Sequence, residues 1–430
     1  MDTASDNDNK ECNSDSDPHR KTSRDIVDIP FRLPLRLFGD INNNTRIFRL
    51  KCIDCHAGGE PARVVLSGIP SPPANCTTAL LKRSYMMDRF DHLRKILLLE
   101  PRGYPCQNVN FVFPPSLYRN NNDNDSDNIS SGNSGGTDSW QYVIGEQQKI
   151  YPLMSGHNTI CVATALLECG VIPIEEPLTD FFLEAPAGPI EIRAKCEGGK
   201  AISIAFTNAP SFVEHLDVPV VLPNRSGFVN VKVNVDVAYG GMWYCIVDLQ
   251  QFRTAGPQLF LSKLKLDPSC GKELCRIGEM IKVACREQYP VQHPTEDYPG
   301  CDILAFRDSG NTKNKNNINA VIMSNNVLDW DRPETWTAMI DRSPCGTGTC
   351  AIMATLHARG MLKVGDIFDH YSIVGSKFTG TILAETTLTN GKIAILPRIE
   401  GSACITQYSE VVVDGDYDPF PEGYKVADIW

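Results

Sequence analysis

The chain has 430 residues, of which 42% are hydrophobic and 22% charged, and its formal net charge is −11. Length and composition predict a globular protein of about two domains, and the lack of a long basic run argues against a nucleic-acid partner. No apolar run approaches the roughly 20 residues of a membrane span, and the acidic N-terminus resembles neither a secretory signal nor a transit peptide. We therefore expect a cytoplasmic protein without a membrane partner, in which the 16 cysteines are free thiols.

Three polar segments interrupt the regular pattern of the chain. Residues 1–27 have neither aromatic side chains nor apolar periodicity, which predicts a disordered tail. The tract at 119–139 is of low complexity and the tract at 308–319 is rich in asparagine. Both are predicted to be surface loops inserted between ordered elements, without a role in chemistry.

The segment Cys52–His56 has the spelling CxxCH of a haem attachment site. It lies in RIFRLKCIDCHAGG, where polar and apolar residues alternate, so a strand with two incidental thiols is the better interpretation. No second CxxC and no pair of histidines has the spacing of a zinc site. We therefore predict no haem attachment and no metal site.

Strands and helices alternate along the rest of the chain. Apolar residues at helical spacing predict helices at 84–99 and 272–287, and Gly198-Gly199 predicts the turn of a hairpin. Alternating or continuous apolar runs predict strands at ARVVLSGI (62–69), VNFVFP (109–114), VNVKVNVDV (229–237), LAETTLT (383–389), GKIAILP (391–397) and EVVVDG (410–415).

Two stretches of the chain are similar to each other, MSGHNTICVATALLECG at 154–170 and PCGTGTCAIMATLHARG at 344–360. Their alignment pairs Ser155 with Cys345, Gly156 with Gly346, Thr159 with Thr349, Leu166 with Leu356 and Gly170 with Gly360. Each stretch predicts a helix that ends at a glycine. The duplication predicts two α/β domains related by pseudo-symmetry, residues 28–207 and residues 208–395.

The two helix starts have the composition of an anion site. Glycine lets the backbone approach a ligand closely, and the free N–H groups of the first turn, with the helix dipole, suit a carboxylate. The same field is expected to lower the pKa of the Cys345 thiol toward that of a useful general base. If both starts face one cleft, Ser155 and Cys345 flank the carbon next to that carboxylate and could abstract its α-proton. Two glycine-rich turns with a buried cysteine fit the spacing equally well, and such helix starts also bind phosphates.

Both stretches resemble the signature motifs of the proline racemase superfamily, which also contains 4-hydroxyproline 2-epimerases and trans-3-hydroxy-L-proline dehydratases. The segments that carry the resemblance further are DCHAGGEPARVV (54–65), DHLRKILLLEPRG (91–103), DVAYGGMWY (236–244), IVGSKFTGTI (373–382) and DPFPEGY (418–424). The resemblance implies an α+β fold of two pseudo-symmetric domains, each a mixed sheet around a central helix, with the active site in the cleft between them. In related folds the C-terminal strand returns to the first domain, so residues 396–430 are expected to complete that domain. It also implies a cofactor-independent enzyme, usually a homodimer, that acts on a small imino acid.

The resemblance also implies a role for individual residues. Ser155 and Cys345 would hold the two acid/base places, and Asp341 would pair with the ring ammonium of the substrate, with the His157 side chain nearby. The substrate carboxylate would be bound by the backbone N–H groups of Gly156, His157, Gly346 and Thr347.

Ser155 departs from the pattern of the racemases, which have cysteine at both places. A serine hydroxyl is far harder to deprotonate than a thiol, which disfavours two-way racemisation of proline. Dehydration of trans-3-hydroxy-L-proline to the cyclic imine needs one base only, because the α-hydrogen and the hydroxyl lie on the same face of the ring. This reaction is our main expectation, with Cys345 as the base and Ser155 assisting. The alternatives are 2-epimerisation of 4-hydroxyproline, racemisation of proline and, in another class, a binding protein without turnover.

Two neighbouring amides are candidate pocket residues. Gln107 and Asn108 lie in YPCQNVNFVFP, where proline-specific members of the family tend toward apolar or aromatic residues. Their side chains suit a hydroxylated ring, although an ordinary solvated turn explains them equally well.

Overall fold

The computed structural model describes residues 47–115, 139–224, 228, 231–254, 261–295, 300–309, 317–324 and 327–426. All of them belong to one compact unit, Arg36–Trp430. The predicted tail at 1–27 lies outside the described residues, as do nearly all of the tract at 119–139 and the centre of the tract at 308–319.

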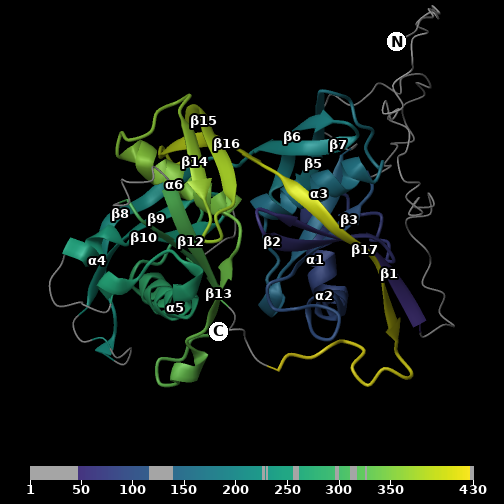
Figure 1. Cartoon of the computed structure of the whole chain (residues 1–430), viewed down its shortest axis with the longest axis horizontal. Coiled ribbons are helices and arrows are strands. Elements are labelled where there is room, and N and C mark those ends of the chain that lie inside the picture. Colours follow the sequence, from purple (N-terminus) through teal and green to yellow (C-terminus); the bar gives the residue numbers. More distant parts are fainter. Residues whose placement is uncertain are drawn as a thin grey trace, which may run out of the picture. The chain divides into compact units, whose positions relative to one another are not determined.

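Two helices are buried and wrapped by strands (Figure 1). They are α3 (Gly156–Glu168) and α6 (Gly346–Ala358), the two helices of the duplicated stretch. Every residue of α3 from Gly156 to Leu167 is buried, as is every residue of α6 from Gly346 to Leu356. A helix without an exposed face lies at the centre of a core, so each of the two helices is the axis about which one half of the molecule is built.

The strands of the two halves follow the same order of pairing. In the first half, the pairings from β1 to β5 follow the chain and alternate between antiparallel (β1 with β2, β3 with β4) and parallel (β2 with β3, β4 with β5). The last three strands, β5, β6 and β7, form an antiparallel meander. These strands are β1 (Ile47–Ala57), β2 (Glu60–Ser67), β3 (Asn108–Phe113), β4 (Trp140–Gly145), β5 (Leu178–Ala185), β6 (Gly188–Glu197) and β7 (Lys200–Thr207).

In the second half, β9, β10, β11, β12, β14, β15 and β16 repeat that series of antiparallel and parallel pairings, and β13 is an addition that pairs with β12. These strands are β9 (Lys232–Tyr239), β10 (Trp243–Asp248), β11 (Ile303–Arg307), β12 (Asn317–Ser324), β13 (Ala338–Asp341), β14 (Ile367–Tyr371), β15 (Lys377–Thr387) and β16 (Ile393–Gly401). The molecule is therefore an α+β protein of two pseudo-symmetric halves.

The last strand of each half pairs with a strand of the other half. β8 (Ser211–Val221) leaves the first half and pairs antiparallel with β9, whereas β17 (Ala403–Asp414) leaves the second half and pairs antiparallel with β1. β7 and β16 also pair with each other, so the strands form one continuous sheet. The exchanged strands join the two halves, so both central helices lie in one framework of strands.

The other helices cover the sheets, and one of them differs from the prediction. The helix predicted at 84–99 is two helices, α1 (Ala79–Arg89) and α2 (Asp91–Leu98), which are separated at Phe90 by a backbone φ of −131°. The break places Asp91 at the first turn of α2, where it pairs with Arg94 at 2.7 Å. The predicted helix at 272–287 is confirmed as α5 (Gly271–Gln288). The remaining helical segments are α4 (Gln250–Thr254) and the 3-10 turns Gln147–Lys149, Leu261–Lys263, Pro268–Cys270 and Pro333–Thr335.

The predicted hairpin is confirmed, and each of the strands predicted at 62–69, 109–114, 383–389, 391–397 and 410–415 falls on an observed strand. The strand predicted at 229–237 is confirmed from Lys232 onward, whereas residues 229 and 230 lie outside the described residues. Gly198 and Gly199 join β6 to β7 with φ of 60° and 74°, the left-handed pair that a two-residue turn requires. Cys52 and Cys55 are buried within β1, in agreement with a strand rather than a haem site.

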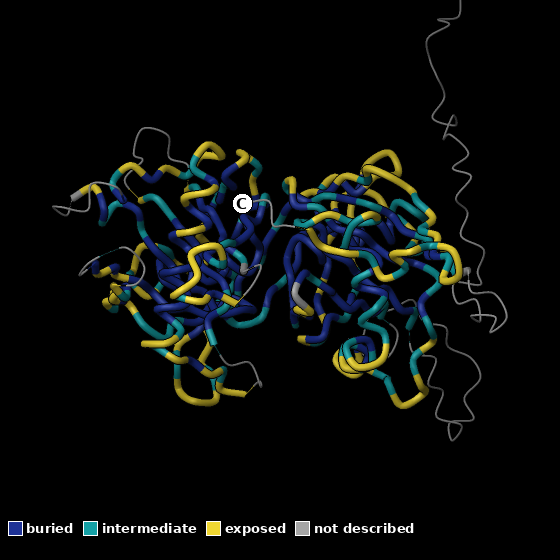
Figure 2. Tube along the Cα trace, turned by 90° about the horizontal axis from the view of Figure 1, so that it is seen from below, coloured by how far each residue is buried: buried dark blue, intermediate teal, exposed yellow. Residues whose placement is uncertain are grey.

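Buried residues concentrate in the interior of each half (Figure 2). One core packs α1 and α2 against β2 and β3, and the other packs α5 against β9 to β12. None of the described helices combines the length and the apolarity that a bilayer span needs.

Candidate active site

The two central helices meet at their first residues. A Cβ atom built on Gly156 would lie 2.7 Å from the Cα of Gly346, and one built on Gly346 would lie 2.8 Å from the Cα of Gly156. Ser155 and Cys345, the residues immediately before these glycines, are therefore close to the same contact, and their exposed fractions are only 7% and 8%. The structure brings together the two residues to which the family resemblance assigned the acid/base places.

A threonine in each helix holds the residue at the helix start. The hydroxyl of Thr159 donates to the carbonyl of Ser155 at 2.8 Å, and that of Thr349 donates to the carbonyl of Cys345 at 2.7 Å. Each threonine has a further partner, the Tyr142 hydroxyl at 2.7 Å in one half and His370 Nδ1 at 2.8 Å in the other. The aligned threonines of the duplicated stretch thus perform the same structural task.

The backbone differs between the two copies at the reactive position. Ser155 is extended, with φ −151°, whereas Cys345 has φ 63°, a conformation that costs free energy for a residue with a Cβ. The preceding loop maintains it, because Ser343 Oγ accepts from the Cys345 N–H at 3.0 Å and Asp341 Oδ1 accepts from the Ser343 N–H at 2.7 Å. Asp341 therefore has a structural role in addition to its predicted one.

The surroundings of the Cys345 thiol correct one expectation. Sγ lies 3.2 Å from the Tyr244 hydroxyl, which is also 2.6 Å from Thr347 Oγ1. Burial raises the pKa of the Cys345 thiol and the Asp341 carboxylate raises it further, while hydrogen bonds from Tyr244, the Gly348 N–H and Thr347 lower it. The helix start acts in the expected direction but burial outweighs it, so the prediction of a lowered pKa is wrong.

The Ser155 hydroxyl has two nitrogen neighbours. His157 Nδ1 lies 3.2 Å from Ser155 Oγ, and the Asn158 amide donates to the same oxygen at 3.0 Å. His157 Nε2 in turn lies 3.0 Å from Asn108 Nδ2. Burial lowers the pKa of His157, and the Asp341 carboxylate opposes that effect.

Three carboxyl groups influence one another beside the helix starts. Glu60 accepts from the Arg342 N–H at 2.7 Å, while its Oε1 is buried without a partner. Burial and the nearby Asp341 raise the pKa of Glu60 well above its usual range, and the same two causes raise that of Glu146 to about 8. A cluster of this kind suits a ligand that carries a positive charge.

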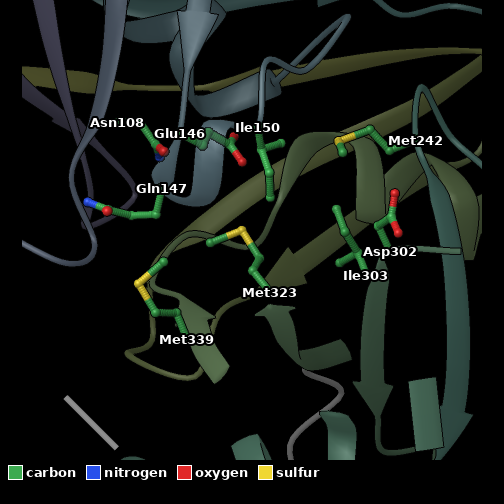
Figure 3. Close-up of a pocket in the computed structure, with 9 residues that line it drawn as sticks. All are labelled: Asn108, Glu146, Gln147, Ile150, Met242, Asp302, Ile303, Met323 and Met339. Carbon is green, nitrogen blue, oxygen red and sulfur yellow. The ribbon is translucent and has the colours of Figure 1, made fainter. Parts of the chain in front are cut away.

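A pocket opens next to this cluster (Figure 3). Its polar lining comes from Asn108, Glu146, Gln147 and Asp302, and its apolar lining from Ile150, Met242, Ile303, Met323 and Met339. Gln107 does not line this pocket: its side chain is buried and its Oε1 has no partner. The two candidate amides of the sequence thus separate, and only Asn108 faces the pocket.

Four further residues of the site had no role in the sequence analysis: Glu60, Tyr244, Glu146 and Asn158. Glu60 and Tyr244 lie in CHAGGE and GGMWY, inside segments that carried the family resemblance, so a signal existed for them. Glu146 follows a strand after the low-complexity tract and carries no motif. Among the residues that the structure describes, no group of three or more His, Cys, Asp or Glu side chains is arranged to hold a metal ion.

The structure has two pseudo-symmetric halves whose central helix starts abut, with Ser155 before one helix and Cys345 before the other, which is the arrangement that the family resemblance implies. The family model described as "Proline racemase" matches residues 52–123 and 138–425, and the chain belongs to the proline racemase family.

Relatives of known name are similar over most of the chain. It is 32% identical over 382 residues to the 4-hydroxyproline 2-epimerase of Rhizobium etli and to 4-hydroxyproline 2-epimerase 1 of Rhizobium rhizogenes; each alignment covers 89% of this chain and 96% of the relative. The structure of a hydroxyproline epimerase from Agrobacterium vitis with bound trans-4-OH-L-proline is 31% identical, with a TM-score of 0.70, and covers 89% of this chain and 97% of that one. A probable proline racemase from Agrobacterium radiobacter with bound carbonate is 32% identical, with a TM-score of 0.71 and coverage of 89% and 98%.

Proposed function

We propose that this protein inverts the α-carbon of a 4-hydroxyproline, the reaction of a 4-hydroxyproline 2-epimerase. The observation that carries the proposal is the 31–32% identity, over 89% of the chain, to relatives that bear this name and to an epimerase structure that holds trans-4-OH-L-proline. This is the alternative of the sequence analysis rather than its main expectation.

The abutting helix starts supply a place for the substrate. Its carboxylate would accept from the first-turn N–H groups, those of Gly156, His157, Gly346 and Thr347, where the positive ends of two helix dipoles meet. Cα would then lie between Ser155 Oγ and Cys345 Sγ, one on each face. The N–H donors would stabilise the charge that develops on the carboxylate as the α-proton leaves.

The ring ammonium would complete the charge balance of the site. Asp341 raises the pKa of the Cys345 thiol and of the Glu60 carboxyl. A substrate cation beside Asp341 offsets that negative charge and lowers the pKa of the thiol, so that substrate binding itself helps to prepare the base.

The pocket would receive the ring hydroxyl. The Asn108 amide can donate or accept a hydrogen bond, and Glu146, whose pKa is raised to about 8, is protonated at neutral pH and can donate one. The methionines and isoleucines of the same pocket would contact the methylene groups of the ring.

Dehydration of trans-3-hydroxy-L-proline is the second candidate, and Ser155 favours it. A site with a single thiol has one strong base, and water loss from this substrate uses one face only. Cys345 would take the α-proton and give it to the departing hydroxyl, which leaves as water. The enamine that remains would tautomerise to the cyclic imine.

Proton NMR in D2O separates the candidates. With trans-4-hydroxy-L-proline we expect deuterium to enter at Cα and cis-4-hydroxy-D-proline to accumulate, with the hydroxyl retained. With trans-3-hydroxy-L-proline, an imine that reacts with o-aminobenzaldehyde would identify the dehydratase. Water loss without inversion of any 4-hydroxyproline, in folded protein, would reject the epimerase proposal.

A further inference from the structure

We propose that the Ser155 hydroxyl is one end of a proton relay whose other end is the imidazole of His157, with the Asn108 amide as its positioning residue. The inference rests on the proposed function, because it concerns how the serine face of that site exchanges a proton with Cα. It gives the His157 side chain a task beyond the carboxylate contact of its backbone N–H.

The three side chains form an unbroken series of contacts. Ser155 Oγ is 3.2 Å from His157 Nδ1, and His157 Nε2 is 3.0 Å from Asn108 Nδ2. Their exposed fractions are 7%, 5% and 4%, so little bulk water can compete for the proton. A hydroxyl beside an imidazole that a third group orients is the arrangement by which proteins activate a weak nucleophile or base.

Serine needs such a partner if it is to remove a proton. As the α-proton bonds to Ser155 Oγ, the hydroxyl's own proton passes to His157 Nδ1, and the electron pair of the broken C–H bond stays on the substrate as the carbanion. Cys345 then gives its thiol proton to the opposite face of Cα. The products are the inverted imino acid, a thiolate and an imidazolium.

The opposite reaction uses the same groups in reverse. The Cys345 thiolate takes the α-proton, the carbanion takes the hydroxyl proton of Ser155, and the His157 imidazolium returns a proton to Oγ. One proton is thus shared between sulfur and imidazole, and no oxidant, reductant or further reactant is required.

The relay requires an unprotonated Nδ1, and therefore a proton on Nε2, in the neutral ring as well as in the imidazolium. A half-turn of the Asn108 amide brings its C=O to Nε2, where it accepts from that N–H and holds the ring in the tautomer whose Nδ1 can take the Ser155 proton. Within the described part of the chain, Asn108 makes no other side-chain hydrogen bond, so the amide is free to turn. The Asn158 amide, which donates to Ser155 Oγ at 3.0 Å, stabilises negative charge on that oxygen during the transfer.

Asp341 is the charged group that acts on this imidazole. Burial, the larger effect, lowers the pKa of His157, and the negative charge of Asp341 raises it. The ring is therefore neutral and able to accept a proton near pH 7, and Asp341 stabilises the imidazolium once it has formed.

The first test combines two substitutions. His157→Gln keeps the backbone N–H and can still hydrogen-bond Asn108, but it cannot take up a proton. Inversion of 4-hydroxyproline should fall on the order of 100-fold in either direction. A thiol at position 155 is acidic enough to act unaided, so Ser155→Cys/His157→Gln should invert nearly as fast as Ser155→Cys alone. Undiminished inversion in His157→Gln, or an equal loss in both backgrounds, would overturn the relay.

The second test needs no turnover. In Ser155→Cys, the pH dependence of iodoacetamide alkylation at position 155, located by peptide mass spectrometry, reports the pKa of the introduced thiol. A proton-accepting imidazole lowers that pKa, so adding His157→Gln should move the midpoint upward by about one unit or more, and Asn108→Leu should move it less in the same direction. His357→Gln, at the far end of α6, is the control and should leave it unchanged.

The two tests separate the inference from the function on which it rests. A shifted alkylation midpoint in a protein that inverts no hydroxyproline would keep the relay and reject the epimerase. An unshifted midpoint in an active epimerase would reject the relay alone. Circular dichroism of each variant verifies that it is folded.

Discussion

Gly156 and Gly346, 190 positions apart in the chain, touch through their Cα atoms so closely that neither tolerates a side chain: the added Cβ would lie 2.7 or 2.8 Å from the opposite Cα. The obstacle on each side is backbone of a buried helix start and cannot rotate away. Because Ser155 and Cys345 immediately precede these glycines, the contact fixes how closely the two residues approach each other.

Gly156→Ala should act as a wedge between the helix starts. We expect a loss of about 1 to 3 kcal/mol in the free energy of unfolding, from overpacking. Inversion should fall on the order of 100-fold, because the two reactive groups are moved apart. Urea denaturation and the NMR rate measure the two effects.

Gly170→Ala is the matched control, since Gly170 ends the same helix in open space with φ 69°. It should cost about 1 to 2 kcal/mol for its left-handed backbone and leave the inversion rate intact. A Gly156→Ala protein as active as Gly170→Ala would show that the contact does not position the site.

Tyr244→Phe should raise the pKa of the Cys345 thiol. The Tyr244 hydroxyl is 3.2 Å from Sγ and its hydrogen bond lowers that pKa. Without it, less thiolate is present at any pH below the midpoint, so alkylation of Cys345 and inversion should both slow, by about tenfold for each unit of the pKa shift.

Tyr142→Phe is the control, because it removes a buried tyrosine hydroxyl behind the other helix, where the partner is Thr159. Alkylation of Cys345 in that variant should follow the wild-type pH curve. An unchanged curve in Tyr244→Phe as well would mean that the tyrosine only packs against the sulfur.

Glu146 should make the free energy of unfolding of the protein depend on pH. Its pKa is about 8 in the folded state against an ordinary value of 4.5. Between these values the folded state binds more protons than the unfolded one, so the free energy of unfolding should decrease as pH rises through that window. Glu146→Gln should remove this contribution, so the free energy of unfolding of the variant should rise relative to that of the wild type between pH 5 and pH 8. Urea denaturation at the two pH values measures this difference. Parallel curves for the two proteins would contradict the raised pKa.

Local features of the molecule could be predicted from the sequence because local physics determines them. The Gly198-Gly199 turn, α5 and the two central helices each follow from periodicity, positive φ or a glycine stop within a few residues. The pairing of Ser155 with Cys345 could be proposed because both copies of the motif carry the same helix-start chemistry.

Tertiary features could not be predicted from those patterns. Phe90 continues the apolar spacing of a helix, and the break there depends on where Asp91 meets Arg94 and Tyr151 in the folded chain. β17 pairs with β1 near the other end of the chain, and β8 pairs with β16 as well as with β9, which follows it in the sequence. No periodicity encodes this exchange of strands between the halves. These features follow from long-range packing.

The candidate site also combines features that the sequence predicts with features that depend on the fold. The helix-start argument gave the correct sign for the effect of the Gly348 N–H on Cys345, but burial and Asp341 outweigh it, and neither is visible in a motif. Asn108 could be named as a pocket residue, whereas its contact with His157 depends on how β3 lies against α3. Spacing identifies the groups, and the fold decides their pKa values and partners.

The central claim is that Ser155 and Cys345 act on opposite faces of one α-carbon, and deuterium exchange in D2O with each purified 4-hydroxyproline epimer tests it most directly. Ser155→Ala and Cys345→Ala should both lose inversion, and any exchange at Cα that remains should be confined to one epimer in the first variant and to the other epimer in the second. Inversion that survives in either folded variant, or exchange confined to the same epimer in both, would contradict the account.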